Sequence, residues 1–243
     1  QGTIAKEIED LGGYTNAATS FDYTVYIVDV PAAHWAKGLD ILQDMAFNPL
    51  IDANELESEK KVVLSELERG EDDSNGYIFN QIQAMALAGT PYERPIIGYR
   101  ETVSAFTRQD ILDYIANWYQ PQSMLLVVCG QVKPQAVLEE ANKLFGERKN
   151  THLWSPPQSI DPKTLAKGPN IKVEKRPLNQ VYLHATLPVP GYTAPNEPAL
   201  EILTHLLGGD NTSLFYRKYK YETQLVDDIS VYLYSFERLG MIY

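Results

Sequence analysis

Two strand-like segments follow one another near the start of the chain with almost nothing between them. Residues 14–20 and 23–30 are rich in β-branched and aromatic side chains, and only Phe21 and Asp22 separate them. Such a short connection allows antiparallel pairing alone, because parallel strands need a crossover of roughly a dozen or more residues. With the helical patterns that follow, the pair favours an α+β layer fold with mostly antiparallel sheet over a doubly wound parallel sheet.

The rest of the first half of the chain is predicted to be mainly helical. Apolar residues at helical spacing predict helices over residues 3–11, 33–47, 52–69, 77–88, 110–118 and 134–145. Asp52 or Asn54 is placed to cap the third of these helices, and Thr107 to cap the fifth. The apolar run Met124–Val132 is predicted to be a buried strand, with Cys129 as a small core residue rather than a nucleophile.

Composition changes between residues 149 and 170, where Pro, Ser, Thr, Lys and Gly dominate. This stretch is predicted to link a first domain, residues 1–148, to the start of a second, residues 171–243. Beyond it, strands are expected over residues 171–175, 180–187 and 225–234, and helices over residues 197–207 and 213–221. Both chain ends are expected to interrupt an element, a helix at Gln1 and a strand at Tyr243.

Charge and hydropathy narrow the range of partners. The formal net charge of −11 argues against a nucleic-acid backbone as the main partner. An acidic surface can attract basic peptides, but a solvated acidic face is the commoner explanation. No apolar run reaches the roughly 18–20 residues that span a bilayer, so no membrane span is predicted. The single cysteine excludes an intrachain disulfide, and the compartment stays open.

The helix expected over residues 52–69 carries two acids where its apolar positions cluster. Glu59 and Glu66, seven residues apart, project within roughly 20° of each other on an α-helix. They fall inside the arc spanned by Val62, Val63 and Leu67. Carboxylates among core residues need a hydrogen-bond partner, an opposite charge or a metal ion. On helix geometry alone, a pair at the edge of the core, satisfied by arginine or main chain, is favoured over a metal site.

No complete catalytic motif accompanies these acids. The histidines form neither an H-E-x-x-H nor an H-x-x-E-H spacing, and they are His34, His152, His184 and His205. The sequence also lacks a G-x-S-x-G elbow, a phosphate-binding loop, a dinucleotide fingerprint and a paired-cysteine site. The residue chemistry alone therefore indicates an α+β protein without indicating its function.

Five segments, in one order and at consistent spacing across residues 1–148, carry a resemblance to a known family. They are Gly12–Ser20 with Tyr23–Tyr26, the helix segment Glu59–Glu66, the loop Pro91–Gly98, the helix Thr107–Tyr119 and the strand Leu125–Val132. Each is a weak motif alone, whereas the ordered set is specific. The set resembles peptidase family M16, the group of pitrilysin, insulinase and mitochondrial processing peptidase.

The resemblance implies the M16 layer fold, of the LuxS/MPP-like metallohydrolase type, in tandem homologous halves. It also implies a zinc-dependent endopeptidase that hydrolyses peptides in a chamber between two halves, with one zinc ion per active site. By matching positions, Glu66 is a metal ligand and Glu59 a supporting catalytic acid. Asn16 and Ala17 belong to the edge strand onto which a substrate peptide adds through main-chain hydrogen bonds.

The same resemblance implies that most of the zinc site lies outside this sequence. The family's H-x-x-E-H motif is expected shortly before Gln1, so the chain is interpreted as a fragment that is inactive alone. In the second half, Glu201–His205 takes the place of the motif, with His205 as its one histidine. Lys220 and Asp227 stand where many active members carry Arg and Tyr.

These departures keep a second interpretation open. A non-catalytic M16 homologue could act as a structural or binding partner of an active subunit. A peptide substrate is the expected ligand, and a second copy of the chain or a second M16 subunit is the expected assembly partner. Neither nucleic acid nor a membrane is expected.

Overall fold

The computed structural model describes residues 3–151, 158, 160–165 and 170–243. His152 and part of the predicted linker lie outside these residues. The chain forms two compact units: Gln1–Glu66 with Tyr99–Pro156, and Leu67–Gly98 with Pro157–Tyr243. The division into domains 1–148 and 171–243 remains a prediction.

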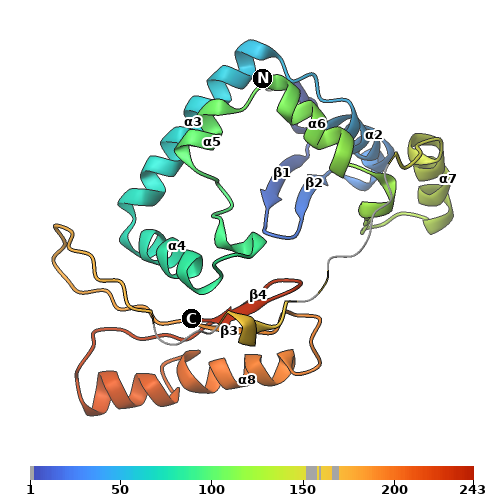
Figure 1. Cartoon of the computed structure of the whole chain (residues 1–243). Helices are drawn as coiled ribbons and strands as arrows, with labels where there is room; N and C mark the ends of the chain where they lie inside the picture. The colour runs from blue at the N-terminus through green and yellow to red at the C-terminus, as the bar shows by residue number, and fades with distance from the viewer. Residues whose placement is uncertain (1–2, 152–157, 159, 166–169) are drawn as a thin grey trace. The chain divides into compact units, whose positions relative to one another are not determined.

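The first unit is mostly helical and contains one two-stranded sheet (Figure 1). Its main elements are α1 (Thr3–Asp10), β1 (Tyr14–Thr19), β2 (Thr24–Asp29), α2 (Trp35–Phe47), most of α3 (Ala53–Asp72), α5 (Arg100–Ala105), α6 (Arg108–Trp118) and α7 (Pro134–Phe145). The helices predicted in this part of the chain are confirmed, with small shifts at their ends. Thr107 caps α6 as expected, because its hydroxyl oxygen accepts a hydrogen bond from the Asp110 N–H at 3.2 Å.

The predicted hairpin is confirmed. β1 and β2 pair antiparallel along their whole length. Helix α2 packs against β2 and buries Leu39 and Ile41. The approach is close at Gly38, where an added Cβ would lie 3.0 Å from the side chain of Val30 and 3.3 Å from that of Val28. A larger residue at this position would push the helix away from the hairpin.

The buried strand predicted over Met124–Val132 is wrong. These residues join no strand ladder within the described chain, and Leu125 is 87% exposed. Cys129, expected in the core, is also exposed. A strand is stabilised by the neighbouring strand that satisfies its main-chain groups. No described segment pairs with residues 124–132 as a neighbouring strand. An apolar run does not specify such a partner strand by itself.

The second unit contains a small antiparallel sheet and two main helices. Its elements are the end of α3, α4 (Ser74–Ala86), β3 (Leu187–Val189), α8 (Glu197–Gly208), a π-helical segment (Tyr216–Glu222), β4 (Leu233–Ser235) and β5 (Gly240–Ile242). The strand order is β3-β5-β4, and both pairings are antiparallel. Val189, Leu239 and Met241 are buried and form part of the core of this sheet.

The strands of the second unit are much shorter than predicted. The segment expected over 180–187 shares only Leu187 with β3, and the segment expected over 225–234 shares only Leu233 and Tyr234 with β4. Residues 171–175 form no ladder within the described chain. The end of helix α8 contacts the segment just before β4, because the Gly208 carbonyl accepts a hydrogen bond from the Val231 N–H at 3.1 Å.

The α+β class and the antiparallel pairing are confirmed, although helices predominate and both sheets are small. The arrangement in tandem homologous halves remains a prediction. Among the described residues, no helix combines the length and apolar character needed to cross a membrane.

Candidate functional site

One edge of β1 offers main-chain groups that β2 does not use. Beyond the ladder, the Ser20 N–H donates to the Tyr23 carbonyl at 2.8 Å, in the same register as the strands. Antiparallel pairs alternate between hydrogen-bonded and non-bonded positions, so the odd-numbered residues of β1 point their N–H and C=O away from β2. These residues are Thr15, Ala17 and Thr19. Within the described chain, no strand pairs with that edge.

Asn16 occupies part of this edge with its own side chain. Its Oδ1 atom accepts a hydrogen bond from the Ala17 N–H at 2.9 Å, and both residues are exposed. The Ala17 N–H is therefore satisfied locally by an amide oxygen that can rotate away. An arriving peptide strand could replace this acceptor with its own carbonyl.

Helix α3 begins at a side-chain cap. The Asp52 carboxylate accepts hydrogen bonds from the N–H groups of Asn54 at 2.8 Å and Glu55 at 3.1 Å. Of the two predicted caps, Asp52 is therefore the one observed. It fixes the start of the helix, and with it the direction in which each later side chain projects.

Glu59 and Glu66 are exposed, so their predicted place among core residues is wrong. The packed stripe of α3 runs through Lys60 and Leu67, whose side chains are 13% and 7% exposed respectively. The stripe is centred away from Val62, which is 50% exposed on the side of the acids. The aliphatic stem of Lys60 packs along the stripe while its ammonium group pairs with Glu57 at 2.7 Å.

The described residues do not form a zinc site. No group of three or more His, Cys, Asp or Glu side chains is close enough within them to hold a metal ion. Catalytic zinc sites use three protein ligands and leave one position open. Glu66 can supply one carboxylate, and Glu59 lies two turns earlier on the same helix. Whether these acids and the Asn16–Ala17 edge act in catalysis remains a prediction.

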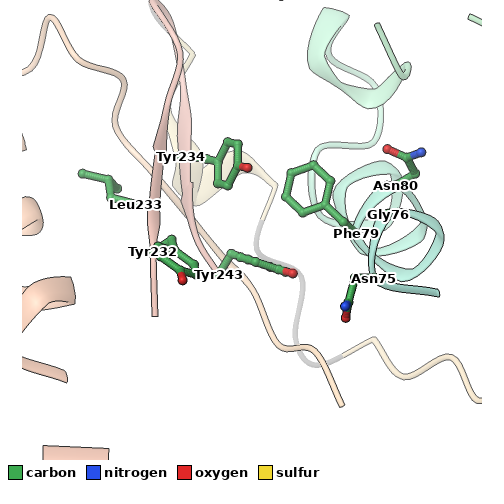
Figure 2. A pocket seen from close by; sticks show the side chains of 8 residues that line it. All are labelled: Asn75, Gly76, Phe79, Asn80, Tyr232, Leu233, Tyr234 and Tyr243. Carbon is green, nitrogen blue, oxygen red and sulfur yellow. The ribbon is translucent and has the colours of Figure 1, made fainter. Parts of the chain in front are cut away.

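An aromatic cavity in the second unit was not predicted from the sequence. It has a volume of about 580 Å³ and is lined by Asn75, Gly76, Phe79, Asn80, Tyr232, Leu233, Tyr234 and Tyr243. Figure 2 shows the Phe79 ring on α4 facing the Tyr234 and Tyr243 rings. Their ring centres lie 4.9 and 5.1 Å from that of Phe79. Tyr232 and Tyr234, two residues apart in a predicted strand, indicated in the sequence that an aromatic surface forms there. The sequence did not show that α4, about 150 residues earlier, forms the opposite wall of the cavity.

Two family models match consecutive parts of the chain. The model described as insulinase, peptidase family M16, matches residues 1–100, and the peptidase M16 inactive domain matches residues 105–243. The chain belongs to peptidase family M16. The resemblance drawn from the five ordered segments is thereby confirmed.

Relatives of this M16 chain carry several names. It is 27% identical over 246 residues to a Bacillus subtilis protein named as an uncharacterized zinc protease, YmxG, covering 98% of this chain and 57% of that protein. It is 29% identical over 202 residues to the bovine mitochondrial-processing peptidase subunit beta, covering 83% and 41%. It is 25% identical over 205 residues to the rat cytochrome b-c1 complex subunit 1, covering 84% and 42%. The chain thus spans only about half of its curated relatives.

Solved structures share the fold of this M16 chain. A protease from Helicobacter pylori superposes with a TM-score of 0.80 at 23% identity, covering 99% of this chain and 59% of the other. A peptidase M16 inactive domain from Pseudomonas fluorescens superposes with a TM-score of 0.74 at 15% identity, with the same coverage.

The second half of the M16 chain has no histidine pair at the expected helix. His205 on α8 is exposed, and its Nε2 lies 3.8 Å from an Asp210 carboxylate oxygen. The Thr204 hydroxyl, at the position expected for glutamate, donates to main-chain carbonyls of its own helix. These contacts satisfy the Thr204 hydroxyl within the helix and place one carboxylate near His205.

Lys220 is held within its own segment. Its Nζ donates to the Tyr216 hydroxyl at 2.7 Å and lies 4.6 Å from the centre of that ring. The hydrogen bond to Tyr216 raises the pKa of Lys220 above its ordinary value, and the charge of Asp228, 3.9 Å away, acts in the same direction. Lys220 is therefore a cation that already contacts Tyr216 and Asp228. Asp227, next to Asp228 in the sequence, is exposed.

Proposed function

We propose that the whole protein is a zinc-dependent endopeptidase, to which residues 1–243 contribute the substrate edge and one metal ligand. In support of the proposal, the chain belongs to family M16 and is related to a protein named as a zinc protease. Glu66 would supply a carboxylate to the zinc, and Glu59 would support it. The remaining ligands are expected from an H-x-x-E-H motif before Gln1, so no catalytic step is derived from this chain alone.

The observation that carries the proposal is the open edge of β1. Ala17 points its N–H away from β2, and among the residues that the structure describes, the side chain of Asn16 is its one acceptor. Main-chain bonding at such an edge binds an extended peptide largely without regard to its sequence. This edge and Glu66 belong to the same compact unit of the chain. A peptide-binding edge and an acid offered to a metal are two of the parts that a metallopeptidase needs.

The test is hydrolysis of an unstructured peptide by the protein extended upstream of Gln1. We expect the upstream sequence to contain H-x-x-E-H, and we expect hydrolysis that a chelator stops and added zinc restores. An upstream sequence without the motif, or hydrolysis indifferent to chelation, would contradict the proposal.

A non-catalytic role is the second candidate, and the second half of the chain favours it. Lys220 and Asp227 replace the Arg and Tyr of many active members, and Thr204 replaces the motif glutamate. Two relatives are named as subunits of larger assemblies. On this alternative, the whole protein would bind peptide without hydrolysing it and would form a homodimer or purify with a second M16 subunit.

A further inference from the structure

The turn between α2 and α3 contains a residue in a strained main-chain conformation. Ile51 has a φ angle of 46°, in the left-handed region, and directly precedes Asp52, which caps α3. A β-branched residue is rarely found in this region, because its Cβ atom crowds the main chain. Such a conformation persists only where the surrounding contacts hold it. The turn therefore needs a contact that keeps Ile51 in place.

Arg108, at the first position of α6, makes such a contact. Its Nε donates to the Ile51 carbonyl at 2.7 Å, and its Nη2 donates to the Leu50 carbonyl at 3.2 Å. Nε and Nη2 lie on one edge of the planar guanidinium group, so the two bonds together fix the orientation of two consecutive peptide groups. We call this pair of hydrogen bonds the Arg108 fork.

The start of α6 does not require the charge of Arg108. The N-terminal end of an α-helix carries a partial positive charge, which disfavours a cation in the first turn. This end is already satisfied by Thr107 and Asp110, which exchange hydrogen bonds between side chain and main chain in both directions. The hydrogen bonds of Arg108 therefore stabilise the turn before α3 rather than its own helix.

The Arg108 fork and the Asp52 cap act on the same end of α3. The Asp52 carboxylate accepts hydrogen bonds from the N–H groups of Asn54 and Glu55, and the Asp52 carbonyl accepts one from the Leu56 N–H at 2.9 Å. These bonds form only while Asp52 keeps the direction that Ile51 gives to the chain. The conformation of the turn thus determines how α3 begins.

The direction of the first turn also affects the side chains further along α3. Glu59 follows Asp52 by seven residues, which corresponds to about 10 Å along the helix axis. A tilt of about 10° at the start would displace Glu59 by roughly 2 Å. Arg108 and Glu59 belong to the same compact unit. The position of this acid therefore depends on how the turn is held.

We infer that Arg108 is a positioning residue. The Arg108 fork holds Ile51 in the left-handed conformation and so sets the direction in which α3, with Glu59, leaves the turn. Lysine cannot replace it, because a single ammonium group on a flexible stem does not orient two carbonyls. The effect on the turn is independent of the proposed function, whereas the effect on hydrolysis through Glu59 rests on it.

The first test measures hydrogen exchange of the N–H groups that bond to Asp52, in the protein extended upstream of Gln1. We expect Arg108→Ala and Arg108→Lys each to speed this exchange at least about threefold, because the turn changes conformation and the cap is lost. Glycine adopts a positive φ without strain, so adding Ile51→Gly to Arg108→Ala should restore slow exchange. Adding Ile51→Ala instead should not restore it, because alanine keeps the Cβ atom.

The matched control is Gln224, the other non-glycine residue with a positive φ among those that the structure describes, at 51°. Gln224→Gly combined with Arg108→Ala should leave the fast exchange as it is. Arg108 is exposed, so its replacement should leave the core intact. Exchange unchanged by Arg108→Ala, or restored equally by glycine and alanine at position 51, would overturn the inference.

The second test is a double-mutant cycle on the rate of peptide hydrolysis by the same protein. If Arg108 acts through Glu59, Arg108→Ala should lower the rate at least about threefold, and no further once Glu59→Gln is present. Ile51→Gly should restore the rate of Arg108→Ala. Equal losses with and without Glu59→Gln would show that Arg108 does not position this acid. A parent protein without hydrolysis would contradict the proposed function instead, and the exchange result would still decide whether the Arg108 fork holds the turn.

Discussion

The Oδ1 atom of Asn16 accepts a hydrogen bond from the Ala17 N–H, 2.9 Å away, on the edge of β1 that faces away from β2. The side chain of one residue thus occupies the main-chain donor of the next at the place where a peptide strand would bind. Asn16 thus satisfies one donor of the open edge, and under the proposed function it would compete with the peptide for that donor. The bond gives this edge a property that can be measured without a substrate.

Replacing Asn16→Ala should expose the Ala17 N–H to water. We expect its hydrogen exchange to become several-fold faster, because the described part of the chain offers this N–H no other acceptor. The Ala18 N–H points toward β2 and serves as the internal control, with unchanged exchange. Equal exchange of Ala17 in the variant and the parent chain would show that the Asn16 contact does not satisfy this donor.

The packed face of α3 can be tested by a pair of truncations. Leu67→Ala removes a buried side chain and should lower the free energy of unfolding by about 2–4 kcal/mol. Val62→Ala, on the exposed side shared with the acids, should cost less than about 1 kcal/mol. Urea denaturation of both variants measures the difference. Equal losses would restore the interpretation in which Val62, and the acids beside it, belong to the core.

Alkaline pH should destabilise the first unit through Tyr119. Its hydroxyl is hydrogen-bonded to that of Tyr26 at 2.7 Å, and burial first, then this bond, raises its pKa well above the ordinary value. A folded-state pKa above the unfolded value, about 10, means that stability is complete below pH 10 and falls as pH rises beyond it. Tyr119→Phe should therefore lose less stability between pH 9 and pH 11 than the parent chain, by urea midpoint.

The exposed Tyr23 provides the control for that experiment. Tyr23→Phe should leave the alkaline loss of stability as it is in the parent chain. A loss that is the same in all three proteins would contradict the assigned role of the Tyr26–Tyr119 pair.

The 243-residue chain alone should neither retain stoichiometric zinc after dialysis nor hydrolyse peptides. Glu66 offers a single carboxylate, whereas catalytic zinc requires three protein ligands. Elemental analysis and an assay with an unstructured peptide check both expectations. One zinc retained per chain and lost in Glu66→Gln would mean that the chain completes a site from residues not assigned to it.

The sequence predicted correctly those elements that are determined by residues close to one another along the chain. The hairpin depends on Phe21 and Asp22, and α6 on the Thr107 cap, so both follow from neighbouring residues. The run Met124–Val132 failed because a strand depends on a partner strand that its own residues do not specify. On α3 the angles between side chains were right, but periodicity alone did not show that the packed stripe includes Lys60 and leaves Val62 exposed.

The candidate site was predicted through the resemblance more than through chemistry. Asn16, Ala17, Glu59 and Glu66 were assigned by matching positions, and their catalytic roles are still predictions. The direction of the Ala17 N–H followed only once the register of β1 and β2 was known. The aromatic cavity at Phe79 was missed because its walls come from segments more than a hundred residues apart in the sequence.

Zinc content and hydrolysis in the protein extended upstream of Gln1 test the central claim most directly, with Glu66→Gln compared to Glu57→Gln. Both changes remove one exposed carboxylate from α3, and the Glu57 carboxylate pairs with Lys60 at 2.7 Å. We predict that Glu66→Gln loses zinc. We also predict that it lowers the rate of hydrolysis by more than roughly 100-fold, the upper end of the loss caused by changing a residue that only supports a metal ligand. Glu57→Gln should retain both. Full zinc and near-normal hydrolysis in Glu66→Gln would contradict its assignment as a metal ligand.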